Sequence, residues 1–279
     1  MKATIAKPQK RRGAGMRSPK RTSKPDRDRT SYSNGTARLP RLGADAPNNR
    51  HRASVALSKS KVADLIEAVE HAEIIGLPLN RTIAIHFEVA ALDRSVRVQE
   101  AVGTFLRLAS QWLRSRGSSF AYIWVLEHAT SIREHVHIMC HCPPELAAEF
   151  DRKAKASWLE KAGMLNNRAA RKRAKDRGHD GDAIVINRMG LRGFHPDAPE
   201  NHRAYKNQVN GALLYHLKSL DPEQFPANDD GHCIVTAPNG QTRVIEPEQG
   251  GTIYGRRCSR SENISAKARQ AYRAIQDAA

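Results

Sequence analysis

Two histidines separated by one residue are the strongest candidates for chemistry in this sequence. His135 and His137 lie in the run HVHIMCHC, which has the alternation of a β-strand, so both imidazoles point to one face and can bind one divalent ion. Glu127, at the end of the preceding apolar run, could supply a carboxylate oxygen; His128 is the alternative, because sequence does not fix the hairpin register. Two histidines and a carboxylate leave coordination positions that phosphate oxygens can fill on Mg²⁺ or Mn²⁺.

A second candidate group lies downstream in the run YHLK. On a helix Tyr215 and Lys218 are three residues apart, so the phenol and the ammonium project to the same side. A tyrosine hydroxyl has a pKa near ~10, and a cation together with a metal-bound phosphate would ease its deprotonation. Tyr205, at the start of the same predicted helix, is the competing nucleophile.

A different interpretation uses Cys140, His141 and Cys142 as soft ligands of a structural zinc ion. Strand alternation opposes it, because the two cysteines face away from His141 and buried cysteines are common in cores. Four cysteines in 279 residues also do not make a disulfide framework.

Periodicity indicates the elements that must position these residues. Their order predicts an α+β fold, with a mainly antiparallel sheet, helices on one face and a ferredoxin-like arrangement. The stretch 221–262 is rich in turn-forming residues and is expected to be mostly loop. The predicted helices span 58–76, 96–117, 145–163, 205–220 and 265–279, and the predicted strands span 79–92, 120–128, 135–142 and 183–189.

Positive charge is concentrated in two segments. The chain has a formal net charge of +17, of which residues 1–50 carry +11 and residues 151–180 carry +6. We expect residues 1–55 to be a disordered basic tail, 56–220 to form the folded domain that holds the candidate site, and 221–279 to be a loop-rich extension with a terminal helix. Basic side chains between 168 and 175 are candidates for phosphate-backbone contacts: Arg168, Arg171, Lys172, Arg173 and Lys175.

The segment HVH at 135–137, the acid Glu127 and the segment YHLK at 215–218, in this order, resemble the motifs of the HUH endonuclease superfamily. The resemblance covers roughly residues 79–220 and favours the replication initiators and single-tyrosine transposases, which place the histidines before the tyrosine. It implies an HUH-type fold and metal-dependent nicking and rejoining of single-stranded DNA through a 5′-phosphotyrosine. It assigns the metal to Glu127, His135 and His137, the nucleophile to Tyr215 and electrostatic help to Lys218.

Composition narrows the class of protein further. No apolar run reaches the ~18 residues of a membrane span, and the N-terminus lacks the apolar segment of a secretory signal, so we expect a cytoplasmic protein without a membrane partner. The expected partner is single-stranded DNA or a DNA hairpin of a plasmid, phage or mobile element. The alternative is a non-catalytic nucleic-acid-binding protein or regulator on the same fold.

Overall fold

The computed structural model describes residues 52–93, 96–129, 133–165, 168–176, 182–190, 199–237 and 240–278, and all of these belong to one compact unit. The basic tail up to residue 51, which the sequence predicts to be disordered, lies outside the described residues.

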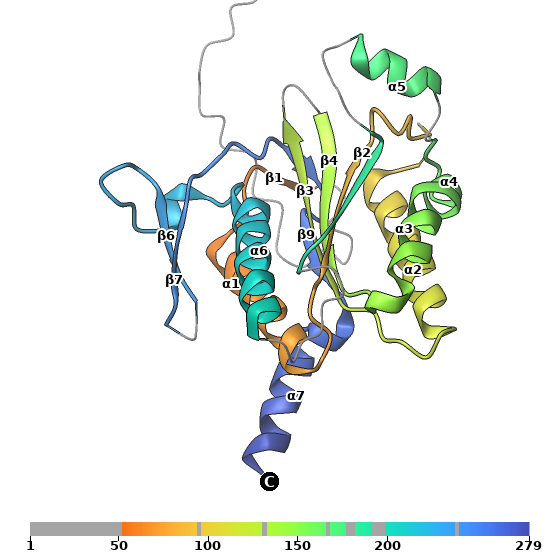
Figure 1. The fold of residues 1–279 in the computed structure, drawn as a ribbon. Helices are drawn as coiled ribbons and strands as arrows, with labels where there is room; N and C mark the ends of the chain where they lie inside the picture. Colours follow the sequence, from red (N-terminus) through yellow and green to blue (C-terminus); the bar gives the residue numbers. More distant parts are fainter. Residues whose placement is uncertain are drawn as a thin grey trace, which may run out of the picture. The chain divides into compact units, whose positions relative to one another are not determined.

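A five-stranded antiparallel sheet forms the centre of this unit (Figure 1). Its strands, in spatial order, are β5 (Ile184–Arg188), β2 (Arg81–His86), β4 (Arg133–Cys140), β3 (Tyr122–Ala129) and β9 (Cys258–Arg260). Every neighbouring pair is antiparallel. The predicted α+β class with a mainly antiparallel sheet is therefore confirmed. The predicted strand at 79–92 is shorter than expected, because β2 ends at His86 and residues 87–91 form turns.

Helices inside the β-α-β-β-α-β unit cover one face of the sheet. They are α2 (Val98–Arg114), α3 (Ala147–Lys153) and α4 (Leu159–Lys161), the last two joined by a π-helical turn over Ala154–Trp158. Apolar residues of β3 and β4 that point to this face, such as Trp124 and Ile138, belong to the same core cluster as Phe105 and Trp158.

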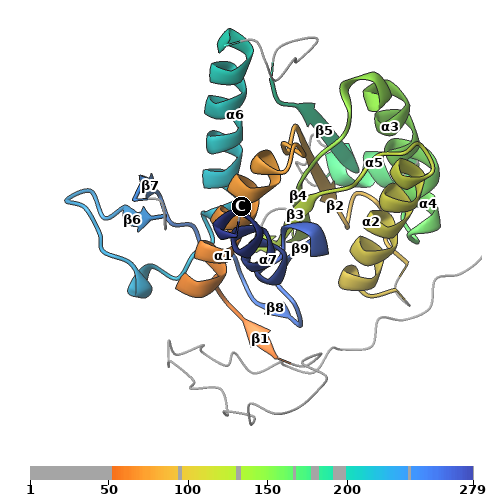
Figure 2. The ribbon, with the colours of Figure 1, turned by 90° about the horizontal axis from the view of Figure 1, so that it is seen from below.

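Helices also cover the other face, which corrects the expectation of helices on one face only. There α1 (Lys59–Ile74) and α6 (Pro199–Leu217) pack against alternate residues of β3, including Ile123 and Val125 (Figures 1 and 2). The physical reason is that β3 is apolar on both faces, as expected of a strand covered on both sides.

The segment after α6 contributes to the sheet rather than only to loops. It forms the hairpin of β6 (Cys233–Thr236) and β7 (Thr242–Ile245), strand β8 (Ile253–Tyr254), the edge strand β9 and helix α7 (Ala266–Asp277). Strand β8 pairs with β1 (Ala53–Ser54), so an ordered strand lies where the sequence predicts the end of the tail. These strands have two to four residues, too few for the alternation by which a strand is recognised in sequence.

The remaining elements are the basic helix α5 (Arg168–Lys175) and the 3₁₀ turns Pro144–Leu146, Pro222–Gln224 and Glu262–Ile264. Among the helices described, none combines the length and apolar character needed to cross a membrane.

Candidate active site

The β3–β4 hairpin brings three potential metal ligands together. Its register pairs Glu127 with His135, and His137 lies two residues further along the same face of β4. The carboxylate Oε2 of Glu127 is 3.3 Å from His135 Nε2 and 3.6 Å from His137 Nε2, and all three residues are buried. No other group of three or more His, Cys, Asp or Glu ligands is found within the described residues. Of the two candidate third ligands, Glu127 joins the histidines, whereas His128 pairs with Glu134 and points to the opposite face.

The hydrogen bonds around these three side chains fit a divalent metal ion. His135 Nδ1 donates to the backbone oxygen of Arg133 at 3.0 Å, and this contact holds its Nε2 at 3.3 Å from Glu127 Oε2. In addition, Glu127 Oε1 and His137 Nε2 are buried without a hydrogen-bond partner in the described part of the chain. Ligands at ~2.1 Å from one ion lie roughly 3.0–3.4 Å apart. Here the carboxylate oxygen lies 3.3 and 3.6 Å from the two imidazole nitrogens, and all three ligand atoms lie within 4.8 Å of one another.

The protonation states of this cluster also suit a metal ion. Burial alone would raise the pKa of the Glu127 carboxyl, but contacts with His135 and His137 and the Lys218 ammonium outweigh burial and hold that pKa well below its usual range. Burial lowers the pKa of His137, although Glu127 opposes the shift. The ionised carboxylate of Glu127 and the neutral imidazole of His137 are the forms in which these two groups bind metals.

The C-terminal end of α6 places Tyr215 and Lys218 beside the cluster. The Tyr215 ring stands at 83° to the His137 ring with centroids 4.9 Å apart, and Lys218 Nζ lies 4.2 Å from the Tyr215 ring centre. Lys218 Nζ is also 3.5 Å from Glu127 Oε2 and 2.8 Å from Glu248 Oε2. Burial lowers the pKa of Lys218, but its hydrogen bond to Glu248 and the charge of Glu127 outweigh burial and raise it, so the side chain remains an ammonium.

The two candidate tyrosines have very different surroundings. Tyr215 is 48% exposed, whereas Tyr205 is 1% exposed and packs in the core between α1 and α6. Ten residues of helix also separate the two by ~15 Å. Tyr215 is therefore the tyrosine that lies at the cluster and is open to solvent.

His216 is a member of the site that the sequence analysis did not single out. Its ring is 5.5 Å from the His137 ring, and its Nδ1 donates to the Ala212 backbone oxygen at 2.7 Å. Burial, and then the nearby His137, lower the pKa of His216 to about 3, so the imidazole is neutral. The sequence could have indicated this role, because His216 follows Leu213 by three residues and so lies on the apolar face of the predicted helix, where a histidine is unusual.

The segment 248–251 joins the end of α6 to β3 and was also missed. The Glu248 N–H donates to the Lys218 backbone oxygen at 2.7 Å, and the His128 N–H donates to the Gly250 oxygen at 2.9 Å. The guanidinium of Arg257, 5% exposed, donates to the Gly250 oxygen at 3.1 Å and also to the Gly251 oxygen. Burial lowers the pKa of Arg257, and Glu127 opposes that shift. Glu248, Gly250 and Gly251 lie in a loop without periodic pattern, so no sequence signal could have found them.

Cys140 and Cys142 lie in the apolar core under α2 and α3, away from the histidine cluster. Burial raises the pKa of both thiols, in Cys142 to about 12, so neither is a thiolate near neutral pH. His141 Nδ1 lies 2.9 Å from the Pro78 backbone oxygen and is not part of the metal-ligand group. The zinc interpretation of Cys140, His141 and Cys142 therefore has no support from their geometry.

Of the basic candidates for nucleic-acid contact, Arg168, Lys172 and Lys175 lie exposed on α5. The side chains of Arg171 and Arg173 lie outside the described part of the chain. Their contact with nucleic acid stays a prediction.

No protein-family model and no curated protein matches the chain. Among solved structures, it is similar to the N-terminal nuclease domain of non-structural protein-1 of minute virus of mice, with a TM-score of 0.31 and 9% identity, covering 71% of this chain and 90% of that one. That domain is described as having a Zn²⁺ coordination in its active-site pocket and a mode of DNA recognition at the origin of replication. A likeness at this level assigns neither a fold nor an activity, so the proposal below rests on the site itself.

Proposed function

We propose that this protein is an HUH-type endonuclease and nucleotidyltransferase that nicks and rejoins single-stranded DNA or a DNA hairpin. Mg²⁺ or Mn²⁺ is its metal, and replication initiation of a plasmid, phage or other mobile element is the matching role. The observation that carries the proposal is the convergence of Glu127, His135 and His137 with the half-exposed Tyr215 and the ammonium of Lys218.

Each of these side chains has a task in phosphoryl transfer. The Tyr215 oxygen attacks the phosphorus of a DNA phosphodiester, and the Oη–P bond forms as the P–O3′ bond breaks. The phenol loses its proton to solvent and the leaving O3′ takes one from solvent, so the products are a 5′-phosphotyrosine and a free 3′-hydroxyl. The Lys218 ammonium stabilises the developing phenolate, since its Nζ lies 4.2 Å from the ring centre. Attack by a 3′-hydroxyl reverses the step and rejoins the strand.

Glu127, His135 and His137 would hold the divalent ion, which supplies Lewis-acid stabilisation of the phosphate oxygens when bound. His216, with its neutral buried ring beside His137, keeps that imidazole in place. The exposed cations of α5 would contact the DNA backbone.

The test is formation of a covalent adduct between the protein and labelled single-stranded oligonucleotides, including hairpins, in the presence of Mn²⁺ or Mg²⁺ on a denaturing gel. Tyr215→Phe removes the nucleophilic oxygen and should abolish the adduct while leaving oligonucleotide binding intact. Tyr254→Phe is the matched control, because Tyr254 is 65% exposed on β8 and should retain the full adduct.

Persistence of the adduct in Tyr215→Phe would refute the assignment of the nucleophile. Wild-type protein that binds these oligonucleotides but forms no adduct with either metal would instead favour the alternative, a nucleic-acid-binding protein without cleavage.

A further inference from the structure

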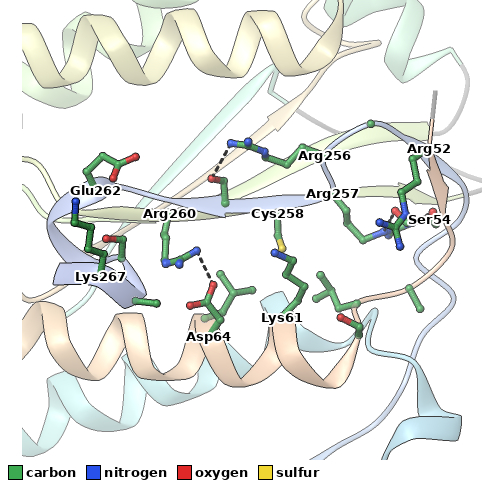
Figure 3. Close-up of a pocket in the computed structure, with 18 residues that line it drawn as sticks. Arg52, Ser54, Lys61, Asp64, Arg256, Arg257, Cys258, Arg260, Glu262 and Lys267 are labelled. Atoms are coloured by element: carbon green, nitrogen blue, oxygen red, sulfur yellow. Dashed lines mark hydrogen bonds and ion pairs between the residues drawn. The ribbon is translucent and has the colours of Figure 1, made fainter. Parts of the chain in front are cut away.

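A basic cavity lies beside the candidate active site, at the edge of the sheet formed by β9 (Figure 3). Its volume is about 710 Å³, within the range of small-ligand sites. The walls come from β1, the start of α1, the 255–260 segment and the start of α7. Six Lys or Arg and two acidic residues line it: Arg52, Lys61, Arg256, Arg257, Arg260, Lys267, Asp64 and Glu262.

Most of these cations are not neutralised by the protein. Asp64 is already paired with Arg260 at 2.6 Å and with Arg269 at 2.9 Å. By contrast, Arg52, Lys61 and Lys267 are exposed and form no ion pair with any described residue. Figure 3 shows Lys61 reaching from α1 toward Cys258, whereas the Arg256 side chain extends from the other side of the β9 segment, where it donates to the Ser259 hydroxyl at 3.4 Å. The cavity therefore gathers positive charge that only an outside anion can balance.

Backbone groups at the rim favour the same kind of ligand. The cavity is lined by Ser58 and Ser265, the N-cap residues of α1 and α7, so two helices present their positive ends to it. The Ser58 side chain does not cap α1 and instead hydrogen-bonds the Ser60 hydroxyl, and the Lys59 N–H donates to Gln224 Oε1 at 2.8 Å. The Ser265 hydroxyl caps α7 by accepting from the Ala268 N–H at 3.2 Å. Gly255, at φ +89°, leaves the opposite wall without a side chain. Unpaired guanidinium and ammonium groups, hydroxyls and helix N-termini are together the donors that bind phosphates.

The cavity is a near neighbour of the metal-ligand cluster. Cys258 of its wall pairs with Val125 of β3, and Glu127 lies two residues further along that strand, a rise of ~7 Å. Arg257, which also lines the cavity, donates to the Leu126 backbone oxygen next to Glu127.

We infer that this cavity binds backbone phosphates of the nucleic-acid strand on one side of the cleaved phosphodiester. This inference rests on the proposed function and adds to it a second anchoring site, separate from the cations of α5. The ligand is a phosphodiester chain, held by Arg52, Lys61 and Lys267 without reading base sequence.

The experiment measures single-stranded oligonucleotide affinity by fluorescence anisotropy over a range of salt concentrations. The triple variant Arg52→Gln, Lys61→Gln, Lys267→Gln is compared with a control of equal charge change on the opposite face of the sheet, Arg107→Gln, Arg114→Gln, Lys161→Gln, whose residues are also exposed. Each lost phosphate contact on a single strand lowers the salt slope by ~0.7 and the affinity about fourfold near ~0.15 M salt. The cavity variant should therefore lose about 50-fold in affinity and about 2 in slope, and the control much less.

Equal losses in the cavity variant and the control would overturn the inference. The inference would also be overturned if the cavity variant lost binding of inorganic phosphate in calorimetry but kept its oligonucleotide affinity, because the cavity would then bind free phosphate. The adduct assay separates this inference from the proposed function: at saturating oligonucleotide the cavity variant should still form the Tyr215 adduct. A wild-type protein that forms no adduct, while the cavity variant loses affinity as expected, would refute the nicking function and leave the cavity standing.

Discussion

Replacement of Glu127 by Gln should remove most of the stabilisation that a divalent ion gives to this protein. The carboxylate is 4% exposed and lies within 3.3 to 3.6 Å of His135, His137 and Lys218. Gln keeps the shape but removes the negative charge that offsets the ion, and it presents an amide in place of one ligand oxygen.

The magnitude follows from linkage between metal binding and folding. At a Mn²⁺ concentration about 100-fold above its dissociation constant, the wild-type protein should gain about 2.7 kcal/mol in the free energy of unfolding relative to EDTA. A variant whose affinity falls about 100-fold gains only ~0.4 kcal/mol under the same conditions. Urea unfolding followed by far-ultraviolet circular dichroism, with Mn²⁺ and with EDTA, measures both gains.

Glu248→Gln is the matched control for this experiment. Glu248 pairs with Lys218 at 2.8 Å but is 61% exposed and is not one of the clustered ligands. This variant should keep the full metal-dependent gain. Our assignment of the ligands is refuted when Glu127→Gln retains the wild-type gain, or when Glu248→Gln loses as much as Glu127→Gln.

Three further outcomes test the fold around the site. Gly251→Ala should lower the free energy of unfolding in urea by more than ~1 kcal/mol, because the alanine Cβ would lie 2.1 Å from the His128 backbone oxygen and residue 251 has φ +60°. An unchanged urea midpoint would contradict this contact. Ile138→Val, buried on the face of β4 opposite the cluster, should cost about 0.5–1.5 kcal/mol and leave the Mn²⁺ gain intact, whereas a lost gain would mean that the two faces are not independent. Burial raises the Cys142 pKa to about 12, so above the ordinary cysteine pKa the folded protein keeps a thiol proton that the unfolded chain loses. The free energy of unfolding should therefore fall as the pH rises above about 9. Cys142→Ala should reduce this slope by up to ~1.4 kcal/mol per pH unit in unfolding measurements at several pH values.

Side-chain positions could be predicted from the sequence where a regular apolar pattern contains the candidate residues. Alternation in HVHIMCHC correctly places His135 and His137 on one face and Cys140 on the other, as the two core clusters and the ligand group show. The apolar stripe of residues 96–117 likewise predicts helix α2 close to its bounds. These patterns are local, so they can be read before the tertiary structure is known.

Contacts between distant segments could not be predicted in this way. Nothing in the loop that contains Glu248 indicates that it reaches Lys218, and the register that selects Glu127 over His128 depends on how β3 and β4 pair. Strand β9 consists of three residues, Cys258–Arg260, whose place beside β3 is set by tertiary packing and not by an alternating pattern.

The hydrogen bonds that Arg257 makes to Gly250, Gly251 and Leu126 have a consequence for when the proposed site is first complete. The hairpin that carries the ligands and the helix that carries the phenol are translated well before this arginine, yet the loop that joins them is held by it. A nascent or truncated chain would thus possess every reactive group and still lack their alignment. Under the proposed function, DNA cleavage would therefore begin only after residue 257 has been added to the chain.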